Sequence, residues 1–266
     1  MAAEPSRAAA FFDLDKTLME GSSAFHFGRA AYRAGMMTRG QILRDAWENV
    51  KFRLNGSTDE GIDALRIRVL DAIAGHRRVD LARLNPDVLS GILPRVYPQM
   101  LEEAWEHQDA GRPAYIVTAA SQELAEMLAH VLILDGGIGF RSELEDDVYT
   151  GRADGPFTYR EGKAQAMREL AEREGIDLGA SYAYSDSESD LPMLRAVGHP
   201  VVVNPDQHLQ RVAREEGWRV MRFDPLRRRL QIGLGALALG GLAAVGGALA
   251  SAQARRSRRR LPLLRG

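Results

Sequence analysis

The stretch that decides the fold is Phe11-Phe12-Asp13-Leu14-Asp15-Lys16-Thr17-Leu18. It ends an apolar run from Ala8 to Leu14 that only Asp13 interrupts, a pattern typical of a buried strand. Asp13 and Asp15 stand at i and i+2, so an extended chain carries both carboxylates on the same side. Their repulsion is costly unless a cation or a shared proton lies between them. The stretch therefore predicts a metal site at a strand end, with a structural turn as the alternative because Asp is common in turns.

Similar apolar runs recur along the chain, and helical patterns lie between or after them. The further strands are expected at residues 114–117, 182–184 and 200–203, and the helices at 122–134, 161–174, 191–196 and 207–216. Strands that alternate with helices form parallel sheets covered on both faces. The sequence therefore predicts an α/β fold with a Rossmann-like, doubly wound, mostly parallel sheet.

Residues 22–93 break this alternation. Four amphipathic helical patterns, at 25–34, 41–54, 61–74 and 79–93, follow one another with no strand between them. A helical insertion in an α/β body accounts for this. We therefore expect a discontinuous catalytic core of residues 1–21 and 94–224 and a helical cap of residues 22–93.

The chain divides into two parts of opposite charge. Nine arginines and no acidic residue follow Asp224, so this segment carries +9, and the remaining 26 basic and 36 acidic residues give the preceding part −10. A body of charge −10 repels nucleic acid, whereas an arginine-rich tail is attracted to anionic lipid or phosphate. The absence of cysteine excludes disulfides, thiolate nucleophiles and cysteine-based metal sites.

The tail, residues 225–266, also contains an apolar segment. Residues 232–250 are 19 consecutive Ile, Leu, Val, Ala and Gly residues, which as a helix would reach roughly 28 Å against a hydrocarbon core of about 30 Å. We expect a transmembrane helix at 230–252 that anchors the body to the cytoplasmic face of a membrane, because no signal-peptide pattern precedes Asp13. The alternative is a helix that lies on the protein surface or self-associates, in which case the protein would be cytoplasmic. The sequence gives no indication of the oligomeric state.

Three further polar motifs follow predicted strands or begin helices. Ligands bind beyond the carboxyl ends of the strands in open parallel sheets, which makes these motifs candidates for the site. Thr118 follows a strand directly, Lys163 lies near a helix start, and Asp186 and Asp190 belong to an acidic loop after a strand. Two of the motifs have ordinary structural alternatives: an N-cap at Thr118 or Ser121 for the hydroxyl motif, and an exposed helical lysine for Lys163.

In their order and spacing, these motifs resemble those of the haloacid dehalogenase-type (HAD) phosphatase superfamily. The resemblance is to its phosphoserine-phosphatase-like members, which carry a helical cap after the first motif, and it covers residues 8–224. It implies that Asp13 is the nucleophile that forms an aspartyl phosphate, and that Asp15 is the general acid and base. It also implies that Mg²⁺ is bound by Asp13, the carbonyl of Asp15 and Asp186, an oxygen shell that suits this ion.

The resemblance assigns supporting roles to other residues. Thr118 and Lys163 would neutralise the phosphoryl oxygens, and Asp190 would orient Lys163 or a metal-bound water. Thr17 matches the third position of the first motif, after Asp13 and Asp15, and would support the site from behind these residues. Substrate contacts are expected from Arg68, which matches the family's carboxylate-binding cap arginine, and from Ser22 and Ala119.

Ser22 departs from the family pattern. Phosphoserine phosphatases usually carry a glutamate at this position, which holds the substrate ammonium, so we expect free phosphoserine not to be the best substrate. A different small or lipid-like phosphomonoester is the expectation, with phosphoserine itself as the alternative. A phosphotransferase that uses the same intermediate, and a membrane-associated binding protein without activity, are the alternatives from other functional classes.

Overall fold

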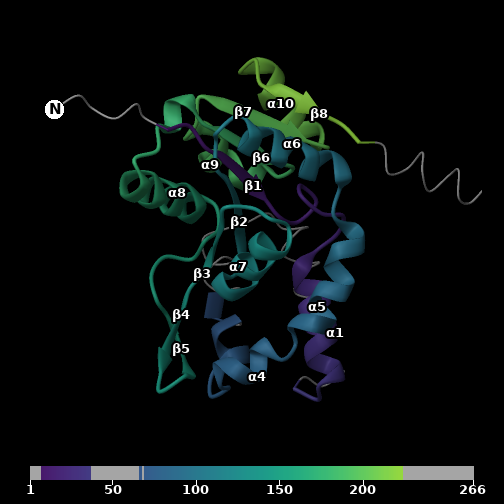
Figure 1. Ribbon diagram of the computed structural model, residues 1–266, viewed down its shortest axis with the longest axis vertical. Helices are drawn as coiled ribbons and strands as arrows, with labels where there is room; N and C mark the ends of the chain where they lie inside the picture. Colours follow the sequence, from purple (N-terminus) through teal and green to yellow (C-terminus); the bar gives the residue numbers. More distant parts are fainter. Residues whose placement is uncertain (1–6, 37–65, 68, 224–266) are drawn as a thin grey trace, which may run out of the picture. The chain divides into compact units, whose positions relative to one another are not determined.

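The computed structural model describes residues 7–36, 66–67 and 69–223. Its centre is a six-stranded sheet in the order β3-β2-β1-β6-β7-β8, and all neighbouring strands in it are parallel (Figure 1). The strands are β1 (Ala10–Asp13), β2 (Ala114–Ser121), β3 (Gly136–Phe140), β6 (Tyr182–Ser185), β7 (His199–Val203) and β8 (Arg219–Met221). This confirms the predicted sheet and its four predicted strands, and adds β3 and β8.

Helices cover the sheet on both faces. One face packs on α8 (Glu161–Glu174), α9 (Leu191–Arg195) and α10 (Gln207–Glu215), through a core that includes Phe11, Val117 and Val202. The other face carries α6 (Pro98–Asp109) and α7 (Gln122–Val131). Because side chains alternate along a strand, Phe11 and Asp13 point to one face and Phe12 to the other. The fold is therefore a three-layer, doubly wound α/β structure.

Helix α7 lies unusually close to β3 because that strand has glycine where a side chain would collide. A Cβ on Gly137 would stand 2.4 Å from the backbone of Ala125, so even alanine is excluded there. The same helix ends at Val131, three residues before the predicted end, because Ile133 adopts a left-handed conformation with φ 59°. The glycine-rich sequence of β3 explains why its strand pattern is weak.

A buried polar network joins α6 to the centre of the sheet. Arg112 Nε donates to Nδ1 of His107 at 2.7 Å, and Nε2 of the same ring lies 2.7 Å from the hydroxyl of Tyr184. A guanidinium has no acceptor, so Nδ1 must accept and Nε2 must carry the proton that is shared with Tyr184. The Tyr184 hydroxyl then donates to Glu103 at 2.8 Å. Every member has a defined role, and the network requires a neutral His107.

The insertion between β1 and β2 begins and ends where two segments run side by side. The Glu20 amide donates to the Arg95 carbonyl at 2.7 Å, the Tyr97 amide donates to the Leu18 carbonyl at 2.9 Å, and Met19 forms an antiparallel bridge with Val96. This neck lies within a few residues of the predicted boundaries at 21 and 94.

The insertion is helical in the part that the structure describes. It contains α1 (Ser23–Arg33), α4 (Arg78–Ala82), α5 (Asn85–Ile92) and a short 3₁₀ turn at Leu93–Arg95. The single helix expected at 79–93 is wrong. It is divided because Pro86, in the first turn of α5, has no amide hydrogen to donate to the carbonyl four residues earlier. The predicted helix at 41–54 lies outside the described residues. Of the one predicted at 61–74, residues 66–67 and 69–73 are helical, and residues 61–65 and 68 lie outside the described ranges.

A two-stranded hairpin, which the sequence did not predict, forms hydrogen bonds with the insertion. Strands β4 (Ser142–Glu145) and β5 (Val148–Ala153) pair in an antiparallel manner. The Tyr149 amide donates to the His76 carbonyl at 2.9 Å, and the Gly75 amide donates to the Tyr149 carbonyl at 2.8 Å. The Tyr149 hydroxyl also donates to Glu123 of α7 at 2.8 Å. The hairpin thus joins the cap segment to the core.

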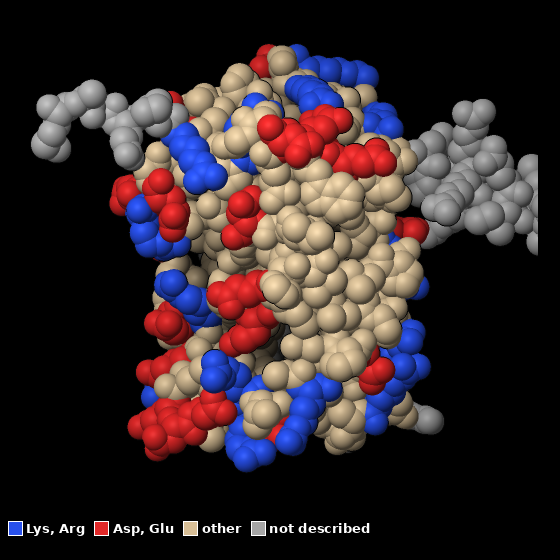
Figure 2. Space-filling view, viewed as in Figure 1, with Lys and Arg blue, Asp and Glu red and all other residues tan. Residues whose placement is uncertain are grey.

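Contacts divide the chain into residues 1–222 and 223–266. None of the helices within the described ranges has the length and apolar character that a membrane crossing requires. The predicted helix at 230–252 lies outside the described residues. On the face of the molecule seen in Figure 2, acidic and basic side chains are interspersed around a broad uncharged area.

Candidate active site

The motif residues meet at the carboxyl edge of the sheet. Asp13 pairs in register with Val117 of β2, and Phe12 pairs with Tyr184 of β6, so Asp13, the second half of β2 and the end of β6 lie at one edge of the sheet. The chain leaves β1 toward β2 on one side and reaches β6 on the other, which makes this edge the topological switch point of the sheet. A crevice at such a point is where open α/β sheets bind ligands.

Lys163 of α8 joins two of the predicted carboxylates. Its Nζ lies 2.5 Å from Asp13 Oδ1 and 2.8 Å from Asp190 Oδ2. All three side chains are buried, and Ser185 Oγ donates to the same Asp190 oxygen at 2.7 Å. Burial alone would lower the pKa of Lys163, but Asp13 and Asp190 outweigh it and raise the pKa. The structure thus places a permanent positive charge beside the predicted nucleophile, and the exposed-lysine alternative is wrong.

The acidic loop is held against the first motif. The Asp186 amide donates to Thr17 Oγ1 at 2.9 Å, so the buried Thr17 links the loop after β6 to the turn after β1. The ammonium of Lys16, a residue with a left-handed backbone, lies 3.9 Å from the Asp186 carboxylate. Thr17 is therefore a structural link between the two parts of the site.

The carboxylates fit a hard cation. Burial raises the pKa of Asp186 to about 6, and burial together with Asp190 and Asp186 raises the pKa of Asp13 despite the opposing charge of Lys163. Asp190 Oδ1 is buried without a hydrogen-bond partner among the described residues. No cluster of three or more His, Asp or Glu side chains in the described ranges forms a metal cage. Two carboxylates and a carbonyl suit Mg²⁺, which keeps several waters when bound to proteins.

Asp15 has both carboxylate oxygens engaged by the start of the cap. Ser22 Oγ donates to Oδ2 at 2.9 Å, and the Ser23 amide donates to Oδ1 at 2.8 Å. The predicted acid and base thus lies at the neck of the insertion. Sequence reasoning placed Ser22 only against substrate and missed this hydrogen bond, because nothing in the pattern indicates how α1 approaches the turn after β1.

The hydroxyl motif lies on the neighbouring strand. Thr118 is buried at the level of Asp13, and its Oγ1 accepts from the Ala120 amide at 3.1 Å, with Ala119 between them. Ser121, rather than Thr118, caps α7, since its hydroxyl accepts from the Leu124 amide. The N-cap alternative is therefore correct for Ser121 and wrong for Thr118. Arg68, the predicted cap arginine, lies outside the described residues.

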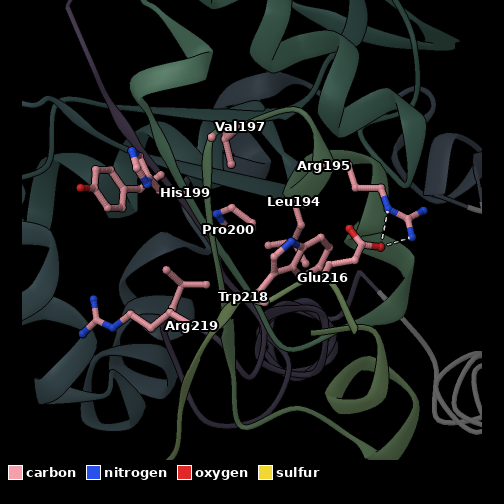
Figure 3. A pocket seen from close by; sticks show the side chains of 12 residues that line it. Leu194, Arg195, Val197, His199, Pro200, Glu216, Trp218 and Arg219 are labelled. Atoms are coloured by element: carbon pink, nitrogen blue, oxygen red, sulfur yellow. Dashed lines mark hydrogen bonds and ion pairs between the residues drawn. The ribbon is translucent and has the colours of Figure 1, made fainter. Parts of the chain in front are cut away.

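A separate hollow lies at the opposite edge of the sheet. It is lined where β6, β7 and β8 begin, by residues that include His199, Pro200 and Trp218, and the Arg195–Glu216 ion pair closes one side of it (Figure 3). The motif residues lie at the carboxyl ends of β1 and β6 and in the second half of β2, so this hollow is distinct from the candidate site.

Comparisons with known proteins agree with this geometry. The chain matches the haloacid dehalogenase-like hydrolase family over residues 10–195. A protein of Mycobacterium tuberculosis named phosphoserine phosphatase is 40% identical over 255 residues, which cover 95% of this chain and 82% of the relative. A histidinol-phosphatase of Neisseria meningitidis is 30% identical over 219 residues, which cover 80% of this chain and 98% of the relative.

Solved structures share the fold. A Bordetella pertussis protein of unknown function superposes with a TM-score of 0.70 at 28% identity, covering 81% of this chain and 98% of that protein. A phosphoserine phosphatase in apo form superposes with a TM-score of 0.59 at 17% identity, covering 85% and 98%, a likeness of fold alone. The chain therefore belongs to the haloacid dehalogenase-like hydrolases and is a phosphatase of that family.

Proposed function

We propose that this phosphatase hydrolyses a small phosphomonoester with Mg²⁺, through a phosphate carried covalently on Asp13. The observation that supports this most is the buried bridge from Lys163 to Asp13 and Asp190. The bridge holds a carboxylate against a fixed cation at the sheet edge where the Thr118 hydroxyl also lies, and these are the groups that transfer of a charged phosphoryl group requires.

Two displacements follow from this arrangement. An oxygen of Asp13 forms a bond to phosphorus as the bond to the leaving oxygen breaks, and the carboxyl proton of Asp15 passes to that leaving oxygen. Asp15, now ionised, takes a proton from a water molecule that attacks the phosphorus. The Asp13–phosphate bond then breaks, so inorganic phosphate is released and both side chains return to their first state.

The remaining residues stabilise charge. Lys163 and Thr118 would contact the phosphoryl oxygens, while Asp190 and Ser185 keep Lys163 in place. Mg²⁺, held by Asp13, Asp186 and the Asp15 carbonyl, would supply further positive charge to the transferring group. Lys163 remains protonated throughout, because its raised pKa excludes a role as a base.

The substrate class rests on the relatives and on Ser22. Phosphoserine and histidinol phosphate, to which the two named relatives point, are both esters of primary alcohols with an amino group on the next carbon. In this chain the Ser22 hydroxyl is donated to Asp15 and offers no anionic partner to an ammonium group. We therefore propose a small or lipid-like primary phosphate ester other than free phosphoserine.

Phosphate release from a panel of esters tests this function. The panel contains phosphoserine, histidinol phosphate, sugar phosphates, nucleotides, glycerol phosphate and lysophosphatidate, each with Mg²⁺ and with EDTA, and Asp13→Asn is the blank. Mg²⁺-dependent release from at least one ester supports the proposal. Full activity in EDTA would contradict the metal dependence, and phosphoserine as the best substrate of the panel would contradict the substrate class.

We also propose that the tail, residues 225–266, attaches the enzyme to the cytoplasmic face of a membrane. The supporting observation is the 19-residue apolar run at 232–250 between two arginine clusters. An enzyme attached in this way would meet lipid-like esters at the surface where they occur.

A further inference from the structure

The first residue of the cap contacts the predicted acid and base rather than its own helix. Ser22 is the N-cap of α1, with extended backbone angles of φ −132° and ψ 128°. An N-cap serine ordinarily accepts a hydrogen bond from an amide two or three residues further along its helix. Ser22 makes no such bond, and its hydroxyl donates to Asp15 Oδ2 at 2.9 Å instead.

Asp15 in turn takes over the capping of α1. Its Oδ1 accepts from the Ser23 amide, one of the helix-start amides that otherwise lack a partner, at 2.8 Å. The two oxygens of one carboxylate are thus tied to two consecutive residues of the cap. Rotation of the Asp15 side chain would break both hydrogen bonds together, so this pair of donors fixes the plane of the carboxylate.

The two donors lie directly beyond the point where the insertion leaves the core. Gly21 precedes them with φ +92°, a conformation that favours glycine, and the neck bond from Glu20 to Arg95 lies one residue earlier. A displacement of α1 relative to the core would therefore act on Ser22 and Ser23 at once. The orientation of Asp15 depends on where the start of the cap lies.

We propose that Ser22 is a positioning residue, which together with the start of α1 holds the Asp15 carboxyl in the orientation that delivers its proton to the leaving oxygen. This role rests on the proposed function, because it presumes that Asp15 is the general acid. It gives the Ser22 position a use in catalysis that does not involve substrate binding. Thr118 and Lys163 act on the phosphoryl group and are not affected by it.

The dependence of kcat/KM on the leaving group separates this role from general damage to the site. The value of kcat/KM includes only steps up to loss of the first product, which is the step in which Asp15 protonates the leaving oxygen. Alkyl phosphates have strongly basic leaving groups that need this proton, whereas 4-nitrophenyl phosphate has a stable leaving anion. A misplaced Asp15 therefore slows the alkyl esters and leaves the aryl ester largely unaffected.

The variants are Ser22→Ala, Ser22→Gly and Ser22→Thr, with Ser90→Ala as the matched control. Glycine remains acceptable at an N-cap while removing the hydroxyl, so it separates the hydrogen bond from helix stability. Ser90 is an exposed serine of α5 in the cap insertion. Its hydroxyl donates to the Asp87 carbonyl of the same helix at 2.8 Å. Thermal unfolding of each purified variant shows whether the fold is kept.

We expect Ser22→Ala and Ser22→Gly to lower kcat/KM for alkyl phosphates roughly 10- to 100-fold and for 4-nitrophenyl phosphate by about threefold or less, since general acid catalysis contributes about 10²–10⁴-fold. Ser22→Thr should restore the alkyl rates, and Ser90→Ala should match the wild type. An equal loss for both ester classes, or none for either, in folded variants would overturn the positioning role. A wild-type chain inactive toward every ester would instead overturn the proposed function, and this role with it.

Discussion

Lowering the pH from 7 to 5 should weaken Mg²⁺ binding. The ion binds ionised carboxylates, and two of its predicted ligands hold their protons unusually strongly in the absence of a cation. Burial raises the pKa of Asp186 to about 6, and burial also raises the pKa of Asp13. As the pH falls through 6, Asp186 takes up a proton, and each Mg²⁺ that binds must displace it.

The size of the effect follows from the pKa of Asp186. With a pKa of about 6, roughly 90% of the Asp186 side chains are ionised at pH 7 and roughly 10% at pH 5. The apparent Mg²⁺ affinity should therefore fall about tenfold between these values from Asp186 alone. The raised pKa of Asp13 makes the fall steeper.

Titration calorimetry of the full chain at several pH values, in buffers of different ionisation enthalpy, measures both the affinity and the protons released. Glu188→Gln is the matched control, because Glu188 belongs to the same loop but is exposed beside His208. It should keep the wild-type pH dependence, whereas Asp13→Asn should release fewer protons. An affinity that is constant from pH 5 to 7, with no proton release, would refute the argument that these buried carboxylates form the metal site.

Three further predictions concern Asp13, His107 and the tail. Asp13→Asn should remove turnover while the chain stays folded, because the amide has the same shape as the carboxylate but is not a nucleophile. Turnover above a few per cent of wild type, in protein shown not to have deamidated, would contradict the covalent mechanism. Burial and Arg112 lower the pKa of His107 to about 4, so this residue stabilises the fold above pH 6.5 and loses that contribution as the pH falls toward 4. Denaturant unfolding should therefore show wild type losing about 3 kcal/mol more than His107→Gln over this range, and parallel pH profiles would be the contrary result. Deletion after Asp224 should give a soluble, active enzyme, while the full chain should sediment with membranes and resist carbonate; full-length protein in the soluble fraction at low salt would contradict the anchor.

The central sheet could be predicted from the sequence because its strands have strong local patterns. Apolar runs such as 8–12 and 200–203 are most stable as strands buried between two layers of helices. Strand β3 lacked such a pattern because its glycines serve close packing against α7 rather than burial of side chains. The β4–β5 hairpin is half-exposed and depends on its contacts with residues 75–78, which no local pattern records.

The clustering of the candidate site residues could be predicted for a related reason. Asp13 ends β1, Thr118 lies in the second half of β2 and Asp186 directly follows β6, so the sheet itself brings them together once its order is known. Lys163 is positioned by α8, and its proximity to Asp13 follows from the packing of that helix on the sheet. The motif spacing was therefore sufficient to predict a common site.

The relation of the cap to the core could not be predicted in the same way. The approach of α1 to Asp15 depends on the neck hydrogen bonds and on the path of the chain through Gly21, neither of which has a periodic signature. The helix expected at 25–34 begins at Ser23, and its N-cap Ser22 forms none of the side-chain hydrogen bonds that such a residue usually makes within its own helix. Ser22 donates to Asp15 instead, so it gives up some local stability for this contact. Departures of this kind are expected at functional sites, where the arrangement of reacting groups outweighs the preference of the local sequence.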